Sequence, residues 1–315
     1  MNEFAERIER DFPVRHKEKE KVNFRTWLVH TLKVLGYSPR LEGGASVLTM
    51  GGNMTNVVVG DIERAKIVLA AHYDTGVREI LPPLLCPTRP ATFLLYQALF
   101  PFLVIAVSFL VSFGVTFALN LPNMTLPLFV LFLIVALFYP KYGKSERDNL
   151  NDNTSGVVAL LEVAKTLTPR YRGEVCFLFL DGGTQASKGA KGLVRAHPEL
   201  KKKSVIVLDC VGEGDELLIL PGKGARWNGE LLDAINSSFE NSERKTCYDK
   251  VDGLVHFPGD QRAFRQGVAV CAVRRVPGFG RFICPTGKDN RIDDENLELL
   301  SRGLVKLAAA YQIKK

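Results

Sequence analysis

A long internal stretch of this 315-residue sequence lacks charged side chains altogether. No Asp, Glu, Lys or Arg occurs in residues 91–140, although these four types make up 24% of the whole chain. A soluble domain rarely leaves so long a run uncharged, because much of its surface contacts water. The remainder of the sequence is correspondingly polar, which indicates two regions with different surroundings.

The sequence also lacks paired cysteines and a secretory leader. Its six cysteines are scattered, without a Cys-x-x-Cys pair or a regular spacing, and the N-terminal MNEFAERIERDF is acidic and amphipathic, with no apolar core. We therefore expect free thiols and a reducing compartment rather than a disulfide framework.

A recognised nucleic-acid motif is absent as well, despite a net charge of +7. The basic residues are interleaved with acids, as in RHKEKEK at residues 15–21. We expect no nucleic-acid partner, and an anionic membrane surface is the better counterpart for the positive charge.

The uncharged stretch contains two apolar runs, at residues 91–119 and 121–139, separated near NLPNM. Each run reaches the roughly 20 residues that cross a bilayer core. The alternative is a buried pair of core helices in a soluble protein. The length of the two adjacent runs favours a transmembrane helical hairpin at residues 91–140.

The charges on either side of the hairpin predict its orientation. Arg78 and Arg89 precede it, Lys141, Lys144 and Arg147 follow it, and the turn between the runs is uncharged. The positive-inside rule places both outer ends in the cytoplasm. We expect an integral membrane protein with two transmembrane helices and a cytoplasmic domain.

The polar parts of the chain alternate between strand and helix patterns. Short apolar runs predict strands at 56–59, 66–71, 175–180, 204–209, 217–220 and 268–273, and helical spacing occurs at 24–37, after 152, and at 293–313. This alternation predicts an α/β fold with a mostly parallel sheet sandwiched by helices. Residues 1–90 and 141–315 would form one discontinuous domain around the inserted hairpin.

Three segments at predicted strand ends or helix starts carry metal-binding chemistry. AAHYDT contains His72 and Asp74, NDNTSG contains Asp152, and VIVLDCVG contains Asp209. His72, Asp152 and Asp209 suit a zinc site with a fourth position for water, and Asp74 would orient the imidazole of His72. Taken singly, His72 fits a structural role, Asp152 a helix cap and Asp209 a strand end.

The motifs HYD, DNTSG, FLFLDG and VIVLD, in this order, resemble the co-catalytic zinc aminopeptidases of the bacterial leucyl-aminopeptidase type. That superfamily also includes glutaminyl cyclases, the transferrin receptor, nicastrin and nicalin. The resemblance covers about residues 50–310 and implies a zinc-exopeptidase-like fold. It implies that His72, Asp152 and Asp209 bind one zinc ion, with Asp152 as the bridge to a second.

The sequence departs from the family where the rest of the active site is expected. The family has a Glu-Glu pair after the Asp-Gly turn, a general base followed by a zinc ligand, and here Gly183 and Thr184 stand in its place. The family's late His ligand is replaced in FICPTGKD by Cys284 or Pro285. A general base contributes roughly 10²–10⁴ in rate, so these changes predict a degraded site with one zinc ion.

Two functions remain open at this point. The first is a membrane-anchored pseudopeptidase that binds a membrane protein or a peptide terminus. The second is an active zinc-dependent aminopeptidase or amide hydrolase at the membrane surface, with Glu213, His256 or the Cys284 thiolate supplying missing groups. Because the hairpin lies between His72 and Asp152, we expect it to hold the site close to the bilayer.

Overall fold

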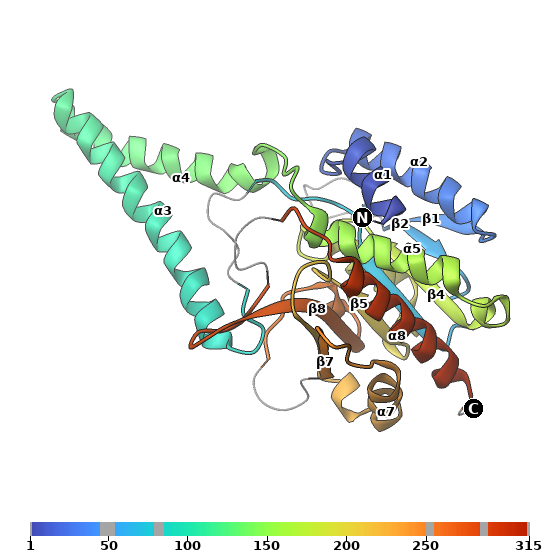
Figure 1. Ribbon diagram of the computed structural model, residues 1–315. Coiled ribbons are helices and arrows are strands. Elements are labelled where there is room, and N and C mark those ends of the chain that lie inside the picture. Colours follow the sequence, from blue (N-terminus) through green and yellow to red (C-terminus); the bar gives the residue numbers. More distant parts are fainter. Residues whose placement is uncertain (1, 45–53, 79–84, 250–254, 284–288, 314–315) are drawn as a thin grey trace.

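The computed structural model describes residues 2–44, 54–78, 85–249, 255–283 and 289–313. Its centre is a nine-stranded mixed sheet of order β1-β2-β4-β3-β5-β8-β6-β7, with β9 paired to β8 (Figure 1). The strands are β1 (Pro39–Gly44), β2 (Met54–Val59), β3 (Ile67–His72), β4 (Val175–Leu180), β5 (Ser204–Leu208), β6 (Glu216–Pro221), β7 (Thr246–Asp249), β8 (Gln266–Val276) and β9 (Gly280–Phe282).

The sheet is parallel in its middle and in the edge pair β6–β7. The pairs β4–β3, β3–β5 and β5–β8 are parallel, as is β6–β7, whereas β1–β2, β2–β4, β6–β8 and β8–β9 are antiparallel. The expectation of a mostly parallel sheet is therefore corrected to a mixed sheet. The antiparallel pairs come from strands β1, β2, β6 and β9, which extend the parallel central strands on either side.

Helices cover both faces of the sheet, as the sequence predicts. The helices are α1 (Glu3–Asp11), α2 (Glu18–Val34), α3 (Pro90–Ala118), α4 (Thr125–Tyr142), α5 (Gly156–Thr166), α6 (Lys188–Ala196), α7 (Gly229–Ser238) and α8 (Asp294–Ile313). The larger core packs α1, α2, α5, α7 and α8 on one face, and the smaller core packs α6 on the other.

The side chains of strand β3 alternate between the two cores. Ile67, Leu69 and Ala71 point into the larger core, while Val68 and Ala70 point into the smaller one, and all of them are fully buried. Successive strand side chains alternate between faces, so a central strand must be apolar throughout. This is why the uninterrupted apolar runs predicted the central strands well and the edge strands poorly.

The helices α3 and α4 project from the domain as a hairpin (Figure 1). α3 has a mean hydropathy of 2.4 over its most apolar window, of which only 11% is buried, and it is long enough to cross a bilayer. The second helix, α4, continues to Tyr142, and the apolar stretch Pro122–Ala136 is shorter than that of α3. Among the described residues one helix thus qualifies as a span, and the second predicted span is unconfirmed.

The two ends of the hairpin insertion meet directly beyond β3. Arg78 donates a backbone hydrogen bond to Lys144 (2.7 Å) and Glu146 donates one to Gly76 (3.1 Å). Farther along, the backbone N–H of His256 donates to Pro87 (3.0 Å). The insertion therefore leaves the domain a few residues after His72, at the edge of the sheet where the parallel strands end.

Candidate metal centre

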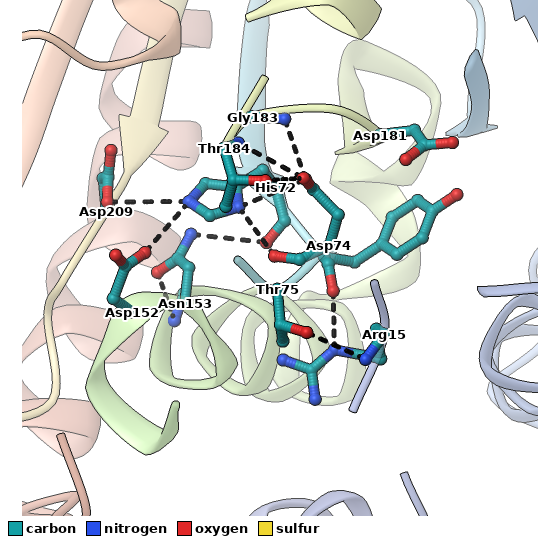
Figure 2. A network of polar contacts seen from close by, with 12 residues as sticks. Arg15, His72, Asp74, Thr75, Asp152, Asn153, Asp181, Gly183, Thr184 and Asp209 are labelled. Carbon is teal, nitrogen blue, oxygen red and sulfur yellow. Dashed lines mark hydrogen bonds and ion pairs between the residues drawn. The ribbon is translucent and has the colours of Figure 1, made fainter. Parts of the chain in front are cut away.

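His72, Asp152 and Asp209 come together at the carboxyl ends of the central strands, as expected (Figure 2). His72 is the last residue of β3, Asp209 follows β5, and Asp152 lies in the turn that precedes α5. The Nε2 atom of His72 lies 3.3 Å from Oδ1 of Asp152 and 3.8 Å from Oδ1 of Asp209. One ligand atom of each residue lies within 4.8 Å of the others.

The Asn153 side chain connects the ends of β3 and β5 to the start of α5 by hydrogen bonds. Its amide nitrogen donates to the carbonyl oxygens of His72 (3.4 Å) and Leu208 (2.9 Å), and its Oδ1 accepts from the backbone N–H of Cys210 (3.2 Å). The same Oδ1 accepts from Gly156 at the start of α5 (3.2 Å). Asn153 rather than Asp152 thus caps the helix, which leaves the Asp152 carboxylate available to face His72.

The charges around His72 favour a cation. Burial alone would lower the pKa of His72, but hydrogen bonds with Asp152, Asp209 and Asp74 overcome it and raise that pKa well above the ordinary value. Asp152 is the open side of the group, with 50% of its side chain exposed against 11% for Asp209. A cation at this point would be reached from the Asp152 side.

Asp74 contacts the His72 ring on the side opposite to Asp152 and Asp209. Nδ1 of His72 lies 3.2 Å from the Asp74 carbonyl oxygen and 3.4 Å from its Oδ1. Burial would raise the pKa of Asp74, yet His72, Thr184 and Gly183 together lower it to about 2. Asp74 is therefore an ionised second contact of the imidazole, which leaves Nε2 directed at Asp152 and Asp209.

Gly183 and Thr184 both donate hydrogen bonds to the carboxylate of Asp74. The Gly183 N–H donates to Oδ1 of Asp74 (2.8 Å), and Thr184 donates to Oδ2 through its N–H (3.2 Å) and its hydroxyl (2.6 Å). A Cβ placed on Gly183 would lie 2.4 Å from Cγ of His72. No side chain fits at position 183 in this backbone, and the Thr184 hydroxyl is engaged with a carboxylate rather than directed at a metal.

Of the late loop, the structure describes Asp289 onward, and the degenerate positions Cys284 and Pro285 lie outside the described residues. The Asp289 carboxylate accepts the backbone N–H of Asn151 (2.6 Å) and of Asp152 (3.0 Å). Burial and the nearby Asp152 raise the pKa of Asp289 to about 8. Asp289 thus positions the Asp152 turn through its backbone.

Neither predicted substitute for the missing base contacts the triad in the described structure. Oε1 of Glu213 lies 3.4 Å from Nη2 of Arg274. The His256 ring packs against Phe93 in the first turn of α3, with ring centroids 4.7 Å apart and the planes tilted by 34°. His256 also contacts the Arg262 guanidinium (3.1 Å).

Three residues near the site were not predicted from the sequence. Asn153 and Asp289 support the Asp152 turn by hydrogen bonds. Both lie inside motifs quoted from the sequence, but nothing in the sequence around them indicates these contacts. Asp260 is buried, begins the short helix η6 (Asp260–Ala263), and neither of its carboxylate oxygens has a hydrogen-bond partner among the described residues. Burial raises the pKa of Asp260 to about 6, with His72 acting against it.

The donor set fits a zinc ion. Ligand atoms about 2.1 Å from a tetrahedral zinc lie roughly 3.4 Å apart, close to the 3.3 Å and 3.8 Å separations from His72 to the two carboxylates. An imidazole and two carboxylates are ordinary zinc ligands, and they leave a fourth position open. A zinc ion held there would act as a Lewis acid and would lower the pKa of a bound water.

The chain matches the sequence model of Peptidase family M28 over residues 141–291. No curated protein matches the sequence. Among solved structures, Macrostomum lignano glutaminyl cyclase is 16% identical with a TM-score of 0.60, covering 99% of this chain and 89% of its own. A Zn-dependent exopeptidase from Parabacteroides distasonis is 15% identical (TM-score 0.55; 98% and 95% covered), and the Legionella pneumophila LapA aminopeptidase is 13% identical (TM-score 0.53; 99% and 69%).

Proposed function

Starting from a chain that resembles the co-catalytic zinc aminopeptidase superfamily in sequence and in fold, we propose a membrane-anchored pseudopeptidase. In this proposal His72, Asp152 and Asp209 hold one zinc ion, and the second metal position has been lost. The protein binds a partner at the membrane, a membrane protein or a peptide terminus, and does not hydrolyse peptides efficiently.

The observation that carries this proposal is the environment of Gly183. Peptide hydrolysis needs a group that takes a proton from water and delivers it to the leaving amine. The His72 ring occupies the space that any side chain at position 183 would need, and Thr184 is bonded to Asp74. The loop is thus adapted to holding Asp74 and His72, which supports metal retention and not proton transfer.

We further propose that the α3–α4 hairpin anchors the domain in the bilayer, with both ends in the cytoplasm. Large apolar side chains are exposed along both helices, among them Leu95 (73%), Phe117 (78%) and Leu126 (69%). Because the hairpin ends pair a few residues beyond His72, the metal centre would face the membrane surface. Cross-linking that places the His72 edge away from the bilayer would contradict this arrangement.

The alternative is an active zinc-dependent aminopeptidase or amide hydrolase at the membrane surface. The intact His72–Asp152–Asp209 group favours it, because one zinc ion with an open fourth position can activate water. This reaction would need a base from outside the Gly183 loop.

Hydrolysis of chromogenic aminoacyl amides by the full-length protein, compared with an Asp152→Ala variant, separates the two functions. The pseudopeptidase predicts no difference between them. Affinity purification from detergent extracts then tests the binding role. A partner should be retained by wild-type protein, and turnover that requires Asp152, without any retained partner, would contradict the proposal.

A further inference from the structure

A pocket of about 430 Å³ lies at the same edge of the sheet as the metal centre. It is lined by the segment after β5 (residues 212–215), the residue before β7, the end of β8 and residues 290–293, with Leu150 beside them. Small-molecule sites are commonly clefts of about 300–1,000 Å³. None of the three proposed metal ligands lines this pocket.

Glu213 gives the pocket a buried acceptor. Only 7% of its side chain is exposed, and its Oε1 lies 3.4 Å from Nη2 of Arg274. Its other oxygen, Oε2, has no hydrogen-bond partner among the described residues. A buried carboxylate oxygen without a donor is costly, so this position is suited to a ligand that brings one.

Cationic groups stand nearer the solvent in the same pocket. Arg274 is 37% exposed and uses Nη2 and Nε toward Glu213 and Asp215, which leaves other N–H donors of its five. Arg291 also lines the pocket and is exposed. The acceptor, Glu213, therefore lies at the buried end of the pocket, and the donors, Arg274 and Arg291, lie nearer its opening. A bound ligand would have to place its donor group inward and its acceptor group outward.

The charges of the lining balance. Glu213, Asp215 and Asp293 oppose Lys245, Arg274 and Arg291, three against three. Lys245 is already engaged, because its Nζ donates to the Gly214 carbonyl oxygen (2.7 Å) and to Asp293 (2.5 Å). A ligand that carries both signs of charge suits this lining better than a simple anion or cation.

We propose that this pocket binds a free α-amino acid with its ammonium group at the buried end and its carboxylate near the solvent. The ammonium group donates to Oε2 of Glu213, and the carboxylate accepts from Arg274 and Arg291. The inference goes beyond the proposed function and does not require zinc. The pocket nevertheless adjoins the metal centre, because Oδ1 of Asn151 accepts the N–H of Gly212 (2.7 Å) and of Glu213 (2.9 Å), and Asp152 follows Asn151.

Calorimetric titration of chelator-treated, full-length protein in detergent with a panel of free L-amino acids tests this inference. At least one should bind saturably at concentrations on the order of 10 mM or below. Its two halves, tested for alanine as ethylammonium and acetate, should bind at least about 10-fold more weakly, because each makes only one of the two charge-assisted contacts.

Variants locate the binding. Glu213→Gln and Arg291→Ala should each weaken it about 10-fold or more, and Glu230→Gln, at an exposed position in α7, should not change it. Arg291 is exposed, so its variant remains informative if Glu213→Gln fails to fold. The inference is overturned if no amino acid saturates the wild-type protein, or if the folded Glu213 and Arg291 variants bind as the wild type does.

Discussion

The substitution Gly183→Ala tests the fit between the bare loop and His72. Its Cβ would lie 2.4 Å from Cγ and 2.5 Å from Cβ of His72, atoms near the backbone that cannot swing aside as a flexible chain end can. Overpacking of this kind costs about 1–3 kcal/mol. Displacing the loop would also weaken three hydrogen bonds to the ionised Asp74, each worth about 1.5–3 kcal/mol when a charge is involved.

Against these losses stands a gain of about 0.4–1 kcal/mol, because alanine restricts the unfolded chain more than glycine does. We expect Gly183→Ala to lower the free energy of unfolding by about 2–3 kcal/mol. The matched control is Gly173→Ala, where a Cβ meets no atom within 4 Å. Urea denaturation of both variants measures the difference, and equal stability of the two would refute the close contact between Gly183 and His72.

Three further predictions concern the supports of the centre. Asp74→Asn should weaken zinc binding about 10–100-fold, the usual effect of losing a residue that orients a ligating histidine, as measured by competition with a chromogenic chelator. Lys21→Met should lower the free energy of unfolding by about 2–4 kcal/mol, because the Lys21 Nζ atom donates to the fully buried Asp181 carboxylate (2.8 Å) and Arg25 is a more distant partner at 3.7 Å. In metal-free protein, Asp260 has a pKa of about 6, above its ordinary value of 3.8. Its protonated form is favoured on folding, so its contribution to stability should fall as pH rises from about 4 to 6, and the wild type should lose stability relative to Asp260→Asn over this range.

Each of these variants has an exposed counterpart. Lys19→Met and Asp233→Asn change the same residue types at exposed positions in α2 and α7, and both should leave stability within about 0.5 kcal/mol of wild type. If Lys21→Met were as stable as Lys19→Met, the buried Asp181 carboxylate would not need its ion pair with Lys21 for the stability of the fold. An unchanged pH slope in Asp260→Asn would show that this carboxyl does not titrate in the folded protein as described.

The central strands and the close approach of His72, Asp152 and Asp209 could be predicted from the sequence for one shared reason. Strands buried on both faces must be apolar throughout, so the runs 175–180 and 204–209 were recognisable, and polar residues directly beyond such runs must lie together at one edge of the sheet. His72 and Asp209 follow that rule. The observed β4 matches the predicted strand residue for residue.

The remaining features depend on contacts that no local pattern records. Asn153 and Asp289 support the site through bonds to backbone groups far away in sequence, and the sequence around them reads as ordinary loop. For Gly183 the sequence predicted only that the family's general base is missing at this position. That its N–H and the Thr184 hydroxyl hold Asp74 follows from the close approach of β3 to the loop after β4, which is a property of the folded sheet.

Zinc stoichiometry, measured by elemental analysis of full-length protein purified without chelator, tests the central claim most directly. One zinc ion per chain, lost in His72→Ala and in Asp209→Asn but kept in Thr184→Val, is the result expected when His72, Asp152 and Asp209 form a single site. Two zinc ions per chain, or one that remains after His72→Ala, would contradict the account.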